Sequence, residues 1–202
     1  MYFALLKGFS ISGGLIMAIG AQNAFVIRQG LLGRHLFLIA ILCSIIDAFL
    51  IALGVLGFGK VIALQPILIE VTKYAAIVFL FIYGAISFRS ALKPKFLENH
   101  QEKSSISAKK TVLIILALSF LNPHAYLDTV ILLGSIASQQ PAYEQIFFGL
   151  GAITASFTWF FAITYGSRLF APLLSKASSW KIIDIAIALT MWGIATTLIM
   201  AF

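Results

Sequence analysis

The chain has 202 residues, of which 61% are hydrophobic and 10% charged, and its mean hydropathy is +1.03. Soluble domains carry about 45–50% apolar and about 25% charged residues, so a domain of this size cannot bury so much apolar surface. The composition excludes an ordinary soluble protein and predicts an all-α integral membrane protein. The net charge of +7 does not require a nucleic-acid partner, because Lys and Arg accumulate in the cytoplasmic loops of membrane proteins.

Charged and turn-like stretches divide the chain into apolar segments of the length that spans a bilayer, about 20 residues. The longest hydrophilic stretch, 93–110, is too short for a soluble domain, so residues 1–202 are interpreted as one transmembrane domain. No room is left for a conventional enzyme body, and no cofactor or metal is expected. In chain order the six predicted spans are 4–27, 36–59, 67–88, 111–137, 146–167 and 182–202.

The distribution of Lys and Arg predicts the orientation of these spans. Eleven of the fourteen basic residues fall in the loops after the first, third and fifth spans, and the other side holds only Lys7, Lys60 and Lys73. Basic loops stay in the cytoplasm. Both termini are therefore expected outside the cytoplasm.

The two halves of the sequence look related. Residues 1–92 and 111–202 have equal length and three predicted spans each, and at an offset of 101 the pair 24–25 corresponds to 125–126. Because three spans are an odd number, a second copy would lie upside down in the membrane. This is the inverted-repeat layout of many secondary transporters, which bind substrate near the midplane at interrupted helices.

Polar residues occupy corresponding places in the first spans of the two halves, "GAQNAF" and "LNPHAY". Pro123 lacks a backbone donor and should break its helix, and Gly20 should loosen the other. Freed backbone groups at membrane depth must be buried in protein or line a wet cavity. The alternative is that the amides only join helices by hydrogen bonds. We favour a substrate or ion site built from Gln22, Asn23, Asn122 and His124.

Two acids, Asp47 and Asp128, lie within predicted spans. An ionised Asp at the bilayer centre costs about 2.5–3.5 kcal/mol even on the lenient insertion scale. No Lys or Arg stands in the central part of any predicted span, which suggests that the missing cation is the substrate or a proton. His124 is the alternative partner for Asp128, either in a structural pair or as a proton relay.

Three further residues are assigned with the alternatives open. Trp159 and Tyr126 are candidates for contact with a cationic substrate, although core packing would also explain them. Asp184 lies near the start of the last span and is interpreted as interfacial.

With these residues placed, the chain resembles the LysE/ArgO family of basic amino-acid exporters over essentially its full length. The motifs "GAQNAFVIRQG" at 20–30 and "LNPHAYLDTVILLGS" at 121–135 carry the resemblance, with "ASFTWFF" at 155–161 in support. One departure is Ala21, where the family usually has proline, which argues against a sharp break in the first span. The family's polar positions are occupied here by Gln22, Asn23, Asp47, Asn122, Pro123, Tyr126 and Asp128.

The resemblance implies export of arginine, lysine or close analogues through the bacterial inner membrane, and "NPHAYLD" leans toward the arginine branch. A nucleotide-binding "GxxxxGK[ST]" loop is absent, so an ion gradient must drive transport, and exchange for protons is our hypothesis. The alternative cargoes on the same scaffold are a neutral amino acid or a metal cation. Homo-oligomerisation is left open.

Overall fold

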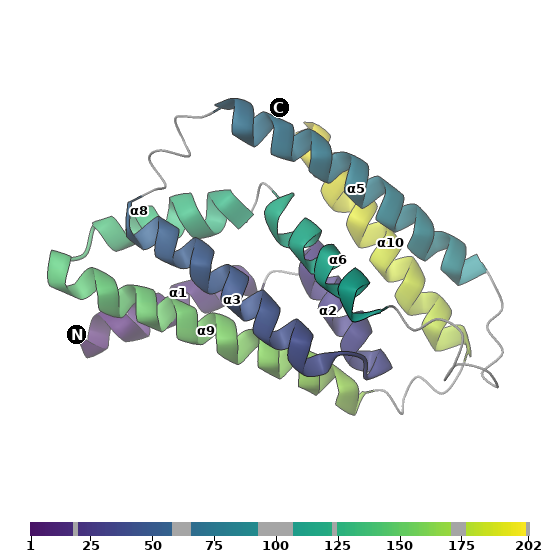
Figure 1. Cartoon of the computed structure of the whole chain (residues 1–202), viewed down its shortest axis with the longest axis horizontal. Helices are drawn as coiled ribbons and strands as arrows, with labels where there is room; N and C mark the ends of the chain where they lie inside the picture. The colour runs from purple at the N-terminus through teal and green to yellow at the C-terminus, as the bar shows by residue number, and fades with distance from the viewer. Residues whose placement is uncertain (18–19, 58–65, 93–106, 123–124, 171–176, 201–202) are drawn as a thin grey trace.

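The computed structural model describes residues 1–17, 20–57, 66–92, 107–122, 125–170 and 177–200, and the regular structure in these ranges is helical throughout (Figure 1). This agrees with the predicted all-α class. The helices are α1 (Tyr2–Ile16), α2 (Ala21–Leu32), α3 (Leu36–Val55), α5 (Pro66–Leu92), α6 (Ala108–Phe120), the π-helix η2 (Tyr126–Leu132), α8 (Leu133–Ser138), α9 (Ala142–Leu169) and α10 (Ala177–Met200).

Three helices of the described chain are long and apolar enough to cross a bilayer: Leu36–Val55, Ala142–Leu169 and Lys181–Met200. The pair α1 and α2 passes the same test as one span bent by 82°. Helical stretches at Ile77–Leu92 and Tyr126–Ser138 are apolar but shorter. The structure therefore supports a membrane protein, while the predicted spans 4–27 and 111–137 are each divided rather than continuous.

Both divisions occur near the motifs that the sequence singled out. Helix α1 ends at Ile16, and α2 begins after Gly20, whose extended backbone (φ −102°, ψ 179°) serves as the N-cap. The chain breaks here although Ala21 replaces the family's proline. In the second half, α6 ends at Phe120 and the next helical turn begins at Tyr126. Pro123 lies outside the described residues.

The corresponding long helices of the two halves form antiparallel pairs (Figure 1). Helices α3 and α9 lie side by side; α1 packs on α9, and η2 and α8 pack on α3. Helices α5 and α10 form the other pair. Helix α2 contacts both groups, through α9 and through α10. The pocket described below lies where the broken helices meet these pairs.

Glycines allow the closest helix crossings. A Cβ on Gly134 would lie only 2.6 Å from the carbonyl oxygen of Gly54, so glycine at this position lets α8 pack directly against α3. Where α1 crosses α9, a Cβ on Gly8 would overlap the Phe148 carbonyl and one on Gly151 would overlap the Leu5 carbonyl. Small residues at such crossings are typical of membrane helices, because close backbone packing replaces the hydrophobic effect.

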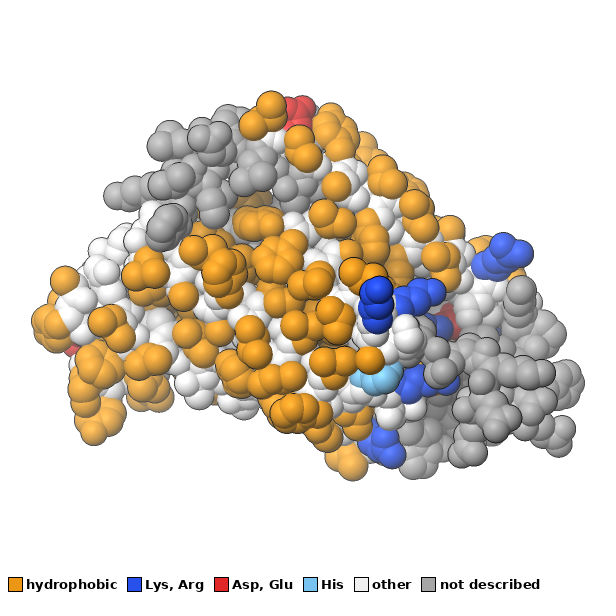
Figure 2. All heavy atoms as spheres, viewed as in Figure 1, with side chains coloured by type: hydrophobic (Ala, Val, Ile, Leu, Met, Phe, Trp, Pro, Cys, Tyr) orange, Lys and Arg blue, Asp and Glu red, His pale blue; other side chains and the backbone are white. Residues whose placement is uncertain are grey.

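Basic side chains gather at one end of the molecule (Figure 2). The C-terminal ends of α2, α5 and α9 and the N-terminal ends of α3, α6 and α10 meet there (Figure 1). Elsewhere the visible face is largely apolar, and exposed residues such as Phe37, Phe49 and Ile146 are more than half accessible. An apolar girdle with one basic end is the surface expected of a protein embedded in lipid.

Candidate functional site

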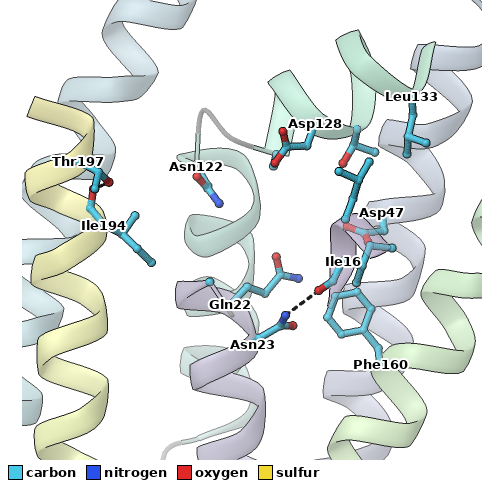
Figure 3. A pocket seen from close by; sticks show the side chains of 14 residues that line it. Ile16, Gln22, Asn23, Asp47, Asn122, Asp128, Leu133, Phe160, Ile194 and Thr197 are labelled. Atoms are coloured by element: carbon cyan, nitrogen blue, oxygen red, sulfur yellow. Dashed lines mark hydrogen bonds between the residues drawn. The ribbon is translucent and has the colours of Figure 1, made fainter. Parts of the chain in front are cut away.

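A cavity of about 300 Å³ opens between the two helix breaks and α3, α9 and α10 (Figure 3). Apolar side chains, including Ile16, Leu133, Phe160 and Ile194, form much of its wall. Six residues that the sequence pointed to also line it: Gly20, Gln22, Asn23, Asp47, Asn122 and Asp128. The fold thus brings together residues from both halves of the chain that lie about a hundred positions apart.

Asp47 projects from the middle of α3 into this cavity (Figure 3). Its Oδ2 accepts a hydrogen bond of 3.1 Å from the hydroxyl of Ser156, which is fully buried on α9. The bond orients the carboxylate and ties α3 to α9. Sequence reasoning did not assign Ser156 a role, although it lies within the "ASFTWFF" motif and is one of the few polar residues there.

Asp128 lies on η2, a single stretch of π-helix that follows the break. Such wider turns are rare and often occur at functional sites, because they misalign the helix locally. Here the π-helix leads into α8, and Thr129 lines the same cavity as Asp128.

Asn23 repairs the break between α1 and α2. Its amide nitrogen donates a hydrogen bond of 2.8 Å to the carbonyl of Ile16, a group left over where α1 ends (Figure 3). Its amide oxygen accepts a bond of 3.3 Å from the indole nitrogen of Trp159. Trp159 does not line the cavity. Its indole contacts Asn23, which lines the cavity, and fixes the orientation of that amide.

Gln22 contributes an unsatisfied donor. Its amide nitrogen is buried and has no hydrogen-bond partner among the described residues apart from the neighbouring thiol of Cys43, a weak acceptor. A buried donor without a partner costs about 1–3 kcal/mol. An acceptor supplied by a ligand would recover that cost.

Tyr126 supports the end of α6. Its hydroxyl donates a bond of 2.8 Å to the carbonyl of Phe120, the last residue of α6, and the side chain packs beside the core. It does not line the cavity, so the sequence-based assignment to substrate contact is not reproduced. His124, the remaining predicted site residue, lies outside the described part of the chain.

The electrostatics of the cavity are one-sided. Among the residues that the structure describes, its lining contains the carboxylates of Asp47 and Asp128 and neither Lys nor Arg. Among the described residues no group of three or more His, Cys, Asp or Glu side chains is placed to hold a metal ion. The arrangement can therefore bind cationic groups of an organic molecule, with amides available for its other polar atoms.

A buried ion pair lies outside this cavity. Arg28 Nε donates a bond of 3.1 Å to Asp184 Oδ1, and the Asp184 side chain is only 2% exposed. Asp184 is thus paired inside the helix bundle, and Arg28 is not a loop residue but part of α2. Sequence reasoning missed the pair because its members are 156 positions apart.

Comparison with known families decides what kind of protein presents this cavity. The profile of the LysE type translocator family matches residues 14–201, which is nearly the whole chain. The chain belongs to this family. The resemblance carried by the two polar motifs is thereby confirmed, and the protein is a multi-pass membrane translocator.

Individual relatives agree with the family over their full length. The translocator is 34% identical to the arginine exporter protein ArgO of Serratia proteamaculans over 198 residues, which covers 98% of this chain and 97% of the relative. It is 37% identical to the protein of the same name from Photorhabdus laumondii, covering 96% and 94%. It is 33% identical to the arginine exporter protein ArgO of Escherichia coli K12, which covers 98% of this chain and 94% of the relative. No solved structure matches the chain.

Proposed function

We propose that this translocator exports a cationic amino acid, arginine in the first place and lysine as a second cargo, from the bacterial cytoplasm in exchange for protons. The observation that carries the proposal is the pair Asp47 and Asp128 in one cavity whose described lining residues include no Lys or Arg. The full-length similarity to proteins named arginine exporter supports the same cargo class. The membrane is the inner membrane, across which a proton gradient is available.

The cavity offers a partner for each polar group of arginine. The guanidinium and the α-ammonium bind the carboxylates of Asp47 and Asp128. The α-carboxylate faces the N-terminus of α2, where the first backbone N–H groups have no partner within the helix and the helix dipole favours negative charge. Gln22 adds its unsatisfied amide donor. Interrupted helices in other secondary transporters present their N-termini to anionic substrate groups in the same way.

Protons supply the energy for export. Moving one positive charge out against an inside-negative potential costs about 2.3 kcal/mol per 100 mV. When the cation leaves, an ionised Asp47 or Asp128 would remain in apolar surroundings, so a proton entering from outside takes the vacant place. Exchange of one arginine for one proton moves no net charge and draws on the pH gradient alone; a second proton would add the membrane potential.

The architecture that we propose for this cycle is a pair of inverted repeats, about 1–92 and 111–202, joined by the cytoplasmic stretch 93–110. The matching positions of the two helix breaks and the antiparallel pairs α3–α9 and α5–α10 support it. The basic end of the molecule faces the cytoplasm and both termini lie in the periplasm. The two repeats rock about the cavity that they share.

The test is efflux of labelled arginine from preloaded cells that produce the translocator or its Asp128→Asn variant. Glu70→Gln is the matched control, because this acid is exposed on α5 and is absent from the cavity lining. We expect efflux in the wild type and control and none in Asp128→Asn, with equal amounts of protein in the membrane. Undiminished arginine efflux from Asp128→Asn would overturn the proposal.

Competition distinguishes the alternative cargoes. Lysine in excess should slow arginine efflux, whereas threonine should not, because it has no cationic side chain for the second carboxylate. Divalent metal ions should not slow it either, because among the described residues no group of three or more His, Cys, Asp or Glu side chains is placed to hold a metal ion. Inhibition by threonine or by a metal ion, without inhibition by lysine, would assign the scaffold to that cargo instead.

A further inference from the structure

A second cavity, of about 230 Å³, lies between α2, α5 and α6 toward the basic end of the molecule. Its wall is apolar around Phe79 and Ile86, but Arg28, Tyr83 and Lys110 also line it. None of these side chains belongs to the cavity of Asp47 and Asp128. The second cavity thus combines an apolar wall with the basic side chains of Arg28 and Lys110, whereas the first is lined by two carboxylates.

Arg28 is held rigidly at this cavity. Its Nε is paired with Asp184, and the Tyr83 hydroxyl is within hydrogen-bonding reach of its guanidinium. A guanidinium has five N–H donors in a planar fork, more than these two partners use. Lys110 stands at the exposed rim. The two cations can therefore meet a carboxylate that enters the cavity.

The two cavities follow each other along the helices. On α2, Gln22 lines the first and Arg28 the second, six residues and about 9 Å further along the axis. Between them lies a pocket of about 10 Å³, no larger than one water molecule requires. Asn122 lines both this small pocket and the first cavity, and Phe79 lines both the small pocket and the second.

The layer between the cavities is apolar and closed. Apart from Asn122 at one edge, the small pocket is lined by apolar residues, among them Phe79, Leu80 and Leu118. Phe79 also stacks on Tyr83, with ring centroids 6.0 Å apart and an angle of 27° between the planes. A charged amino acid cannot pass this layer until α5 and α6 move apart. The structure thus shows two cavities separated by an apolar layer.

We propose that Arg28 and Lys110 bind the α-carboxylate of the cargo in the second cavity, on its way from the cytoplasm to the two aspartates. This proposal rests on the proposed function. The described lining of the first cavity has no Lys or Arg for a carboxylate, and the second cavity, which lies toward the predicted cytoplasmic end, has two such side chains. An amino acid such as arginine carries both kinds of charge. The second cavity binds its carboxylate first, and the cavity of Asp47 and Asp128 then binds its cationic groups.

The consequence is selectivity for amino acids over amines. Agmatine, which is arginine without its carboxylate, would pass the second cavity without using Arg28 or Lys110. Removing these cations should therefore weaken recognition of arginine at the cytoplasmic face and leave agmatine unaffected.

The experiment measures uptake into inside-out membrane vesicles, whose outer surface is the cytoplasmic face, as a function of arginine or agmatine concentration. Lys110→Ala removes the rim cation, and Lys109→Ala is its matched control, because Lys109 is its exposed neighbour on α6 and does not line the cavity. The double variant Arg28→Gln/Asp184→Asn removes both charges of the buried pair together, so that no orphan carboxylate is left.

We expect the half-saturating concentration of arginine to rise about two- to fivefold in Lys110→Ala and about tenfold in the double variant. The value for agmatine and the value for arginine in Lys109→Ala should stay unchanged. Equal losses for arginine and agmatine, or no change in either variant, overturn the proposal. If the double variant does not reach the membrane, Lys110→Ala decides alone.

Failure of the underlying function gives a different result. In that case the wild-type vesicles take up no arginine at all, and the present proposal falls with it. If the half-saturating concentrations do not change but anionic phospholipid stimulates uptake by the wild type and not by the variants, the second cavity is a lipid site and the carboxylate assignment is wrong.

Discussion

At the residue scale, the cavity is built from a few polar side chains whose partners differ in kind. Asp47 is oriented by Ser156, and Asn23 is fixed between the Ile16 carbonyl and Trp159. Such supporting bonds hold a binding group in one geometry and so lower the entropy lost when a ligand binds. The effect of a side chain that faces the cavity can therefore be separated by mutation from the effect of the side chain that positions it.

The Ser156 hydroxyl offers the clearest separation. Ser156→Ala removes one hydrogen bond to Asp47 but no charge, and a neutral donor to a carboxylate contributes about 1–2 kcal/mol. We expect arginine efflux to persist with a half-saturating concentration raised about five- to thirtyfold. Asp47→Asn, measured in the same efflux assay, should abolish transport. Equal activity of Ser156→Ala and the wild type would show that the bond does not position the carboxylate.

At the scale of elements, two features shape the cavity: the breaks between consecutive helices and the close crossings between packed helices. The stops at Ile16 and Phe120 leave carbonyls that Asn23 and Tyr126 satisfy. The contacts depend on glycine, above all where α8 crosses α3 at Gly134 and Gly54. A shift of α8 at this crossing would displace η2 and hence Asp128, because η2 continues directly into α8.

Substituting alanine for Gly134 tests this crossing. Alanine in a helix is normally more favourable than glycine by about 0.5–1 kcal/mol. At Gly134, however, the new Cβ would lie 2.6 Å from the Gly54 carbonyl oxygen, and overpacking against backbone costs about 1–3 kcal/mol or more. We expect a lower unfolding temperature in detergent and slower arginine efflux.

Gly166→Ala is the control for this prediction, because a Cβ there meets nothing within 4 Å. That variant should unfold at the same temperature as the wild type or higher. If Gly134→Ala is as stable as Gly166→Ala, α3 and α8 are not in close contact in the membrane.

At the scale of the whole molecule, charge and apolar surface divide the protein into a basic end and a lipid-facing body (Figure 2). The helix ends that carry Lys109 and Arg168 meet on one side, and the ends near Ser138 and Val55 lie on the other (Figure 1). The positive-inside rule then orients the whole bundle.

Cysteine labelling tests this orientation. The chain has a single cysteine, Cys43, which is buried, so Cys43→Ser gives a background without thiols. In intact spheroplasts a membrane-impermeant maleimide should label Ser138→Cys, whereas Lys109→Cys should be labelled only after permeabilisation. Both positions are exposed in the structure. The reverse pattern would place the basic end, and the cavity of Arg28, on the periplasmic side.

Much of the site was predictable because polarity in an apolar sequence is costly. Gln22, Asn23, Asp47, Asn122 and Asp128 stand out as groups that lipid cannot satisfy, and the structure gathers them around one cavity. Trp159 was singled out because its ring could contact a cation, but in the structure its indole N–H donates a hydrogen bond to Asn23. The sequence does not distinguish these two roles. The ion pair of Arg28 and Asp184 was not predicted, since each residue lies near a predicted span end and only packing brings the two together.

The sequence by itself determined the class of the protein, its helical composition, its family and most of the polar residues of the cavity. These follow from local rules: hydropathy per segment, the cost of polar groups in lipid, and motifs read in order along the chain. The tertiary structure decided which carbonyl Asn23 repairs, where Ser156 meets Asp47, and that a second cavity with opposite charge lies beyond Phe79. These contacts join residues far apart in the chain, and their geometry depends on how the helices cross, which no local pattern specifies.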